Sequence, residues 1–491
     1  MVARRFVIAL VSVTVAAATV VTASRQGAAQ QPSSKAVVMK GRAPVSTELL
    51  KLKLPQPTEA DLSNGLHLMV LEDHRVPQVT FQLLIPGAGG YFDPADASGL
   101  ASVTAAMMRE GTTTLNTLQI SEKLETLAST VGVGTLMSSI DATLSGSSLP
   151  EHFDATFALA ADMLLNPTFP DAELTRYKER TKAGLIQQRS SPGFLANEMF
   201  SRVVYGTHPA SRVSITAPVV DKVTRTMLVD FHRDHYVPDN AVVAIAGDIS
   251  AAEARKVVDG KLAAWKKRGV AAPKFEDPPA IGKGKIFFIA RPNSVQTNFI
   301  VGTQAINRTA PDYDIVQVMN QVLGGGPTGR LFIILREEKG YTYGAYSGLS
   351  TPRFRGNWSA NTEVRTDVTE PAFRDLMIQI ARMRDEPVPE QEFQDKKRGM
   401  VASFALSLES PQAVLQNHIT RWIYKLPADY WDKYPERVAA VTQAQVQDAA
   451  KKYLALERLQ IIAVGDPKIG ESLKQFGTVE TYDTEGKIIG K

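Results

Sequence analysis

Short runs in which hydrophobic and polar residues alternate recur along the chain, and longer segments repeat their apolar residues every three or four positions. Alternation is typical of half-buried strands, whereas the longer spacing is typical of amphipathic helices. We expect strands at 66–71 and 79–85, as a pair, and further strands at 135–139, 142–149 and 241–246. We expect helices at 98–111, 117–131, 150–165 and 170–188.

The pattern of the first half returns in the second half. HFDATFALAADMLLNPTFPDAELTRYKER resembles AFRDLMIQIARMRDEPVPEQEFQDKKRG, and VVAIAGD resembles LQIIAVGD. Pro170 and Pro389 are 219 residues apart, and Gly247 and Gly465 are 218 apart. Because two separate pairs of matching residues are the same distance apart to within one residue, the sequence indicates a duplicated domain. Because strand pairs stand beside helix pairs without strict alternation, we predict an α+β fold of two homologous domains, each a largely antiparallel sheet packed with helices.

Composition sets the boundaries around this repeat. A stretch rich in charge, proline and glycine between the two copies has the character of a linker, and a polar stretch with several prolines precedes the first copy. The predicted segments are a signal peptide at 1–29, an extended arm at 30–57, a first domain at 58–265, a linker at 266–284, a second domain at 285–476 and a tail at 477–491.

The first residues have the three parts of a secretory signal. Arg4 and Arg5 are followed by an apolar run over 6–21, and Gly27 and Ala29 supply small residues for cleavage. An uncleaved membrane anchor is the alternative, although the apolar run is short for one. With no cysteine in 491 residues, disulfides and thiolate metal sites are excluded. An exported, cysteine-free chain fits a bacterial periplasm, with no membrane segment after signal cleavage.

Charge excludes one large class of partner. The formal net charge is +4, with 55 basic and 51 acidic residues, and no basic block is interleaved with aromatic residues. Such a weak balance does not indicate nucleic-acid binding. A length of 491 residues exceeds what one hydrophobic core usually serves, which agrees with two domains.

The stretch LGGGPTGRLFIILREEKGYTYGAYSGLS, residues 323–350, is the best candidate for a functional site. An apolar segment ends in charged residues and Gly340, a helix-stop signal, and alternation then predicts a strand with Tyr341 and Tyr343 on one face. Arg336 therefore closes a helix and Tyr343 opens a strand. Packing alone could also account for these aromatic residues.

This stretch resembles the second signature of the pitrilysin/insulinase family of zinc metallopeptidases, the inverzincins. The resemblance covers nearly the whole chain after residue 58, and it implies two similar halves that enclose a clamshell chamber. It also implies that Arg336 and Tyr343 are catalytic residues that face the zinc from the opposite half of the molecule. Gly324, Gly325 and Gly326 would let the backbone approach an extended peptide, with Tyr341 beside it.

The zinc motif of that family is missing from this chain. The family places His-x-x-Glu-His on a helix after a Gly-Leu-Ala-like start, because residues four apart share one helix face. Here Ser102, Ala105 and Ala106 stand at the three motif positions. The family has one more zinc ligand, a glutamate further along the chain, and Glu179 is the acidic residue nearest to that position. None of the three replacements can bind zinc, so we expect no metal in this chain.

No other constellation takes the place of that motif. His232 and His235 are three residues apart with Asp234 between them, a pattern that we attribute to capping or surface groups rather than to a metal site. Nothing resembles the Gly-x-Ser-x-Gly turn of serine hydrolases. A self-sufficient hydrolase would need a metal or nucleophile that the sequence does not supply.

The leading hypothesis is therefore the non-zinc subunit of a heterodimeric periplasmic peptidase. A homologous partner would supply zinc, and this chain would supply the arginine and tyrosine that stabilise an oxyanion. The alternative is a catalytically inactive scaffold or peptide-binding protein of the same fold.

Overall fold

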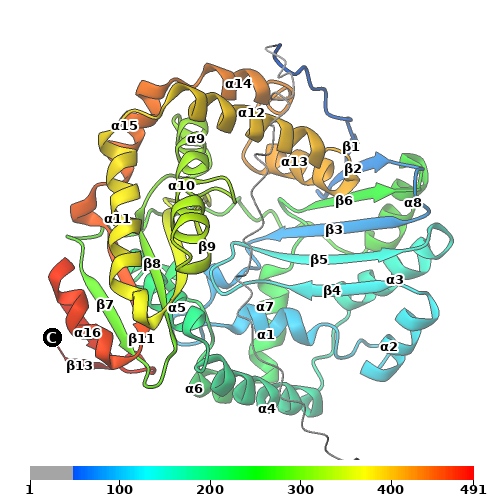
Figure 1. Cartoon of the computed structure of the whole chain (residues 1–491). Coiled ribbons are helices and arrows are strands. Elements are labelled where there is room, and N and C mark those ends of the chain that lie inside the picture. The colour runs from blue at the N-terminus through cyan, green and yellow to red at the C-terminus, as the bar shows by residue number, and fades with distance from the viewer. Residues whose placement is uncertain (1–47, 491) are drawn as a thin grey trace, which may run out of the picture. The chain divides into compact units, whose positions relative to one another are not determined.

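Two mixed sheets, one from each half of the chain, organise the structure (Figure 1). The computed structural model describes residues 48–490, and the residues from Leu49 onward form one unit. The predicted signal peptide and the arm up to residue 47 lie outside the described residues. Among residues 48–490, no helix is both long enough and apolar enough to cross a membrane.

The first sheet has the strand order β1-β2-β6-β3-β5-β4. All of its neighbouring pairs are antiparallel except the parallel pair of β2 and β6. Its strands are β1 (Thr58–Asp61), β2 (His67–Glu72), β3 (Val79–Pro86), β4 (Thr130–Gly134), β5 (Asp141–Ser148) and β6 (Val242–Gly247).

The second sheet has the order β13-β12-β7-β11-β8-β10-β9. Its five-strand core β7-β11-β8-β10-β9 has the same order and directions as β2-β6-β3-β5-β4, with the parallel pair β7 and β11 in the place of β2 and β6. The predicted two-domain α+β fold is confirmed. The strands are β7 (Ile286–Ala290), β8 (Gln296–Gln304), β9 (Thr342–Ser350), β10 (Asn357–Arg365), β11 (Gln460–Gly465), β12 (Val479–Tyr482) and β13 (Ile488–Gly490).

Each half contributes a set of helices, and all but one in each set belong to their own half, where helices cover one face of the sheet and enclose its core. In the first half they are α1 (Leu100–Met107), α2 (Thr117–Thr126), α3 (Phe153–Leu165), α4 (Asp171–Gln188), α5 (Pro192–Tyr205), α6 (Ala217–Lys222), α7 (Arg225–His235) and α8 (Ala251–Leu262). In the second half they are α9 (Tyr313–Leu323), α10 (Arg330–Phe332), α11 (Thr369–Asp385), α12 (Glu390–Ser407), α13 (Pro411–Ile423), α14 (Tyr434–Ala440), α15 (Gln443–Tyr453) and α16 (Gly470–Leu473).

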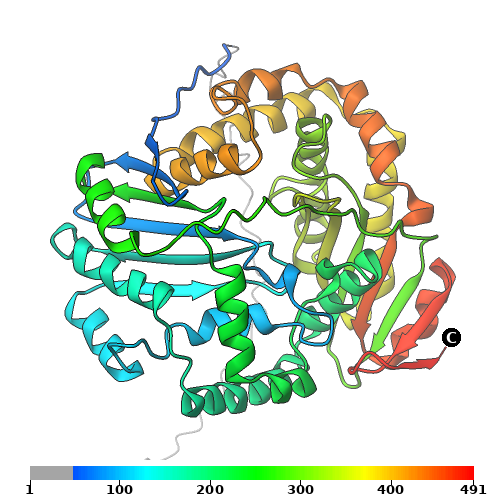
Figure 2. The ribbon, with the colours of Figure 1, turned by 180° about the vertical axis from the view of Figure 1, so that it is seen from behind.

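The halves exchange one helix each across the other sheet face. Helix α5 of the first half lies against the second sheet, and α13 of the second half lies against the first sheet (Figures 1 and 2). Apolar side chains of α5 pack on β7 and β11, and those of α13 pack on β2, β3 and β6. These helices are equivalent in the repeat, because Pro192 and Pro411 lie 219 residues apart and each follows a serine N-cap. The exchange ties the two domains together through buried apolar surface.

Two local predictions were wrong. The strands at 66–71 and 79–85 do not pair with each other, because β6 lies between β2 and β3. The strand predicted at 135–139 occurs earlier, as β4, so the helix before it ends at Thr126 rather than at 131. The first error arises because β6, which separates the two strands, is distant in the sequence. The second arises because residues 135–139 form the connection between the neighbouring strands β4 and β5.

Candidate functional site

The glycine run after α9 brings the backbone against strand β9. The Gly324 amide donates to Asn320 O at 2.9 Å, and the Ser347 amide donates to Gly324 O at 2.8 Å. A Cβ on Gly324 would lie 2.6 Å from the Ser347 nitrogen, so no larger residue fits there. Gly324 is buried, whereas Gly325 is exposed and Gly326 half-buried. A Cβ on Gly325 would lie 2.8 Å from Gln321 Cα, so this position also requires glycine, whereas a Cβ on Gly326 would meet nothing closer than 3.9 Å.

Arg336 lies in a widened helical turn. Helix α10 continues into a π-helix, Ile333–Glu338, which Lys339 closes by donating to Ile334 O at 3.0 Å. Gly340 then adopts φ +61°, the left-handed conformation that the sequence predicted for a helix stop. The Arg336 guanidinium lies 5.1 Å from the Phe332 ring centroid and pairs with Glu337. Phe332 is buried, so it gives the guanidinium a fixed surface to stack on.

A β-bulge in β9 turns Tyr343 outward. Thr342 pairs with Val364 and Ala345 pairs with Thr362, so Tyr343 and Gly344 together oppose the single residue Glu363. Ala345 is buried in the second core, and without the bulge Tyr343 would share its face. Instead, Tyr343 is 90% exposed.

Two threonine hydroxyls hold this bulge. The Gly344 amide donates to Thr342 Oγ1 at 3.1 Å, and both Thr342 Oγ1 and Thr362 Oγ1 donate to Gly344 O, at 2.9 and 3.0 Å. Polar groups that the bulge removes from the ladder are thereby satisfied. The outward position of Tyr343 is therefore built into the strand.

A buried polar network fixes β9 and β10 to α9. Asn320 Oδ1 accepts from Ser347 Oγ at 2.8 Å and from Trp358 Nε1 at 3.0 Å, and Asn320 Nδ2 donates to Ser347 O at 3.2 Å. Trp358 is fully buried and Asn320 is 7% exposed. Sequence reasoning missed Asn320, although an asparagine among the apolar residues of a helix was a signal for it.

Tyr341 differs from Tyr343 in its surroundings. Tyr341 precedes β9, is half-buried and packs against the second core, so the two tyrosines do not present one exposed face as alternation predicted. Tyr341 lies before β9 and directly after the left-handed Gly340, so the alternation of the strand does not extend to it. Tyr341 packs against the second core, and Tyr343 faces solvent.

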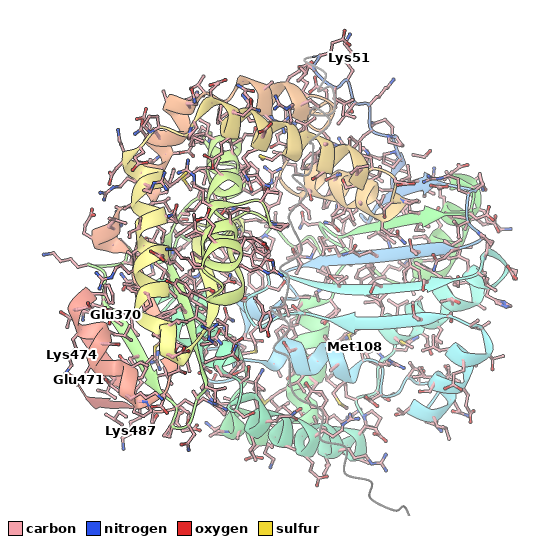
Figure 3. The ribbon with its side chains drawn as sticks, in the orientation of Figure 1. Lys51, Met108, Glu370, Glu471, Lys474 and Lys487 are labelled. Carbon is pink, nitrogen blue, oxygen red and sulfur yellow. The ribbon has the colours of Figure 1, made fainter. Side chains whose placement is uncertain are left out.

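The three positions of the missing zinc motif lie on α1, whose end is marked by Met108 in Figure 3. Ser102 Oγ donates to Thr135 O at 3.2 Å, Ala105 is fully buried and Ala106 is half-buried. Glu179 is exposed on α4. A hydroxyl and two methyl groups do not fit a zinc ion. Within residues 48–490, no group of three or more histidine, cysteine, aspartate or glutamate side chains could hold a metal.

The purified chain is expected to contain far less than one zinc per molecule and to cleave no peptide by itself, because α1 offers neither ligands nor a base. Elemental analysis of chain produced in zinc-supplemented medium checks the first part, and a peptide-library digest checks the second. About one zinc per chain, lost on mutation of a residue of this chain, would contradict it.

The histidine pair on α7 serves the fold. His232 Nε2 bonds Leu164 O at 2.8 Å, and His235 Nδ1 bonds Gly87 O at 2.7 Å. Burial lowers the pKa of both imidazoles and thus favours their neutral forms. Each ring joins α7 to a different segment, so the pair does not converge on one point.

Asp93 caps α1, a role that sequence reasoning missed. Its Oδ2 accepts from the Gly99 amide at 2.6 Å and its Oδ1 from the Ala101 amide at 2.7 Å. Arg212 Nη1 donates to the Asp93 carbonyl at 3.1 Å. Burial raises the pKa of the Asp93 carboxyl to about 6, against the backbone hydrogen bonds and Arg212, which lower it. The DPADASGL sequence before the helix was the available signal.

The raised pKa of Asp93 predicts a pH-dependent stability. The folded state holds this proton more tightly than the unfolded state, whose pKa is near 3.8, so the contribution is complete below pH 3.8 and is lost as pH rises through about 6. Between pH 4 and 7, wild type should lose on the order of 3 kcal/mol relative to Asp93→Asn, which cannot ionise. Urea titrations of both proteins at four pH values measure this, and a constant difference would refute it.

Comparisons with known proteins agree with this architecture. Residues 68–215 match the family model described as Insulinase (Peptidase family M16), and residues 222–400 match the model of the Peptidase M16 inactive domain. The chain belongs to the M16 family, and it lacks that family's zinc motif. The predicted family membership is confirmed.

Some relatives of this chain are named as proteases, and another as a non-peptidase homologue. It is 23% identical over 360 residues to the "uncharacterized zinc protease YmxG" of Bacillus subtilis, which covers 72% of this chain and 85% of the relative. It is 21% identical over 402 residues to the "non-peptidase homolog YmxG" of Helicobacter pylori, covering 81% and 91%. The solved structure of a peptidase M16 inactive domain from Pseudomonas fluorescens is 29% identical, with a TM-score of 0.76 over 84% of this chain and 98% of that one.

Proposed function

We propose that this chain is the non-zinc subunit of a heterodimeric, periplasmic peptidase of the M16 family. One observation carries the proposal: the chain has no zinc ligands on α1, yet a bulge with its own hydrogen bonds presents Tyr343 to solvent. A tyrosine that is 90% exposed contributes little to the stability of the fold. A bulge that holds it in this position therefore indicates contact with a partner or a substrate.

The chemistry of peptide-bond cleavage suits these two side chains. Negative charge develops on the carbonyl oxygen of the scissile bond, and a phenol hydroxyl can donate a hydrogen bond to it. The Arg336 guanidinium, stacked on buried Phe332, adds a positive charge whose plane is already oriented. Gly325 and Gly326, which carry no side chain, leave room for an extended peptide beside them. The partner, a homologous chain with an intact His-x-x-Glu-His, would supply the zinc.

The alternative is a scaffold that binds peptide or stabilises a partner without taking part in cleavage. The Helicobacter relative that is named a non-peptidase homolog favours it, as does the ion pair of Arg336 with Glu337. An exposed phenol together with an oriented guanidinium favours the catalytic proposal, because stabilising an oxyanion needs such donors whereas binding a peptide does not.

Purification of the tagged chain from the periplasm of its native host tests the proposal. We expect one co-purifying homologous chain with His-x-x-Glu-His, in equal amount, and one zinc per pair. Recovery of the chain alone, or with a partner that lacks the motif, would contradict the proposal and favour the scaffold.

A further inference from the structure

A cavity of about 860 Å³ lies between the outer face of the second sheet and helix α5. Its floor consists of outward side chains of three adjacent strands, Asn298 of β8, Ser359 and Asn361 of β10, and Ser350 of β9. Asn197 and Ser201 of α5 face it, and Ser102 lines another wall. The cavity thus joins the position of the lost zinc ligand to the sheet that carries Tyr343.

The cavity floor and Tyr343 share one face of the sheet. Tyr346 pairs with Asn361 across β9 and β10, and both are outward and exposed. The bulge places Tyr343 opposite Glu363, which also points outward on β10. A chain that passes over Tyr343 along β10 therefore meets Asn361 and Ser359 next.

Five of the polar side chains in this cavity are open for binding. Within the described part of the chain, no residue forms a hydrogen bond with the side chain of Asn197, Ser201, Asn298, Ser359 or Asn361. Each amide offers donors and an acceptor, and each hydroxyl offers both. They can pair with the amides and carbonyls of a peptide main chain in either direction.

The lining is almost without charge. Arg212 is the one charged residue among those that line the cavity, and it donates to Asp93 O and Gly90 O. Glu363, the next outward residue of β10, does not line it. A lysine or arginine side chain that entered would lose water, would find no negative charge in the lining and would meet the positive Arg212, which is costly. An aspartate or glutamate side chain would find the Arg212 guanidinium, which is bound only to neutral carbonyls.

We propose that this cavity is a charge filter of the peptide site: it binds a peptide segment with uncharged or acidic side chains and rejects segments with lysine or arginine. The inference rests on the proposed function, because it assumes that peptide reaches Tyr343. It adds a selectivity that the Arg336 and Tyr343 pair does not determine.

Fluorescence anisotropy with three end-labelled peptides of equal length and the full chain tests the filter. One peptide contains only Gly, Ser, Asn, Gln and Ala; the second and third replace two central residues with Lys or with Glu. We expect the neutral peptide and the glutamate peptide each to bind about 10-fold more tightly than the lysine peptide. Equal binding of all three, tighter binding of the lysine peptide than of the neutral one, or no binding of any peptide would overturn the proposal.

An isosteric variant separates the filter from general affinity. Asn361→Asp keeps the shape of the side chain and adds one negative charge to the floor. We expect the lysine peptide to gain about 10-fold in affinity and the glutamate peptide to weaken, with both effects reduced at high salt. Gln187→Glu, on exposed α4 outside the cavity, is the control and should change neither.

The two proposals fail in different ways. If Asn361→Asp leaves all three affinities unchanged, the filter is wrong even where Tyr343 contributes to cleavage. If the three peptides bind as expected while Tyr343→Phe has no effect on cleavage, the charge filter is supported and the catalytic role of Tyr343 is refuted.

Discussion

The Tyr343→Phe variant is expected to assemble with the zinc-bearing partner and to lower kcat of the pair by about 10²–10³, the usual effect of removing one oxyanion donor. Tyr343 is 90% exposed, so the loss of its hydroxyl should leave the stability of the chain nearly unchanged. The loss should fall on kcat more than on KM, because the hydroxyl matters most when charge develops on the carbonyl oxygen. Steady-state kinetics of the purified pair measure both constants.

Tyr341→Phe is the matched control, since it removes the same hydroxyl two residues away from a half-buried side chain. It should retain full activity. Arg336→Lys should also reduce kcat, because an ammonium group cannot reproduce a flat guanidinium stacked on Phe332. Wild-type turnover by Tyr343→Phe with the partner bound would assign this chain to the scaffold class.

The Asn320→Leu variant is expected to lose about 2–5 kcal/mol of unfolding free energy. Leucine has the same branching as asparagine but is bulkier, and it would leave the Trp358 indole N–H and the Ser347 hydroxyl without their shared acceptor in a buried place. Each orphaned group typically costs about 1–3 kcal/mol. Urea denaturation followed by tryptophan fluorescence measures the change.

Ser347→Ala is the control for this network. It removes one hydrogen bond and leaves Asn320 Oδ1 paired with Trp358, so a loss of about 1 kcal/mol is expected. Because Ser347 also holds Gly324 through its amide, Asn320→Leu should in addition lower the activity of the pair by displacing β9. A cost below 1 kcal/mol for Asn320→Leu would show that the network does not fix the strand.

The repeat and the missing motif were readable from the sequence for physical reasons. Pro170 and Pro389 each precede a helix of 18 residues. A proline at a helix start is a local signal, so it can be recognised in both copies without knowledge of the fold. The absence of zinc ligands needed only the residue types at Ser102, Ala105 and Ala106. The helix stop at Gly340 was predictable because a left-handed residue after a helix is most often glycine.

The environment of Tyr343 was not predictable from local pattern. Strict alternation puts Tyr343 on the same face as Ala345, which is buried, and only the pairing with β10 reveals the bulge. The placement of β6 between β2 and β3 depends likewise on paired residues that are 158 to 175 positions apart. The cavity of neutral side chains exists only because α5 crosses to the other half.

Reconstitution of cleavage from separately purified chains tests the central claim most directly. One unstructured peptide that the native pair cleaves is incubated with this chain, with the zinc-bearing partner, and with both. The account predicts no cleavage by this chain, cleavage by the mixture, and a rate for the partner alone that is lower by at least about 10², the contribution of one oxyanion donor. Cleavage by the partner alone at the rate of the mixture would contradict it.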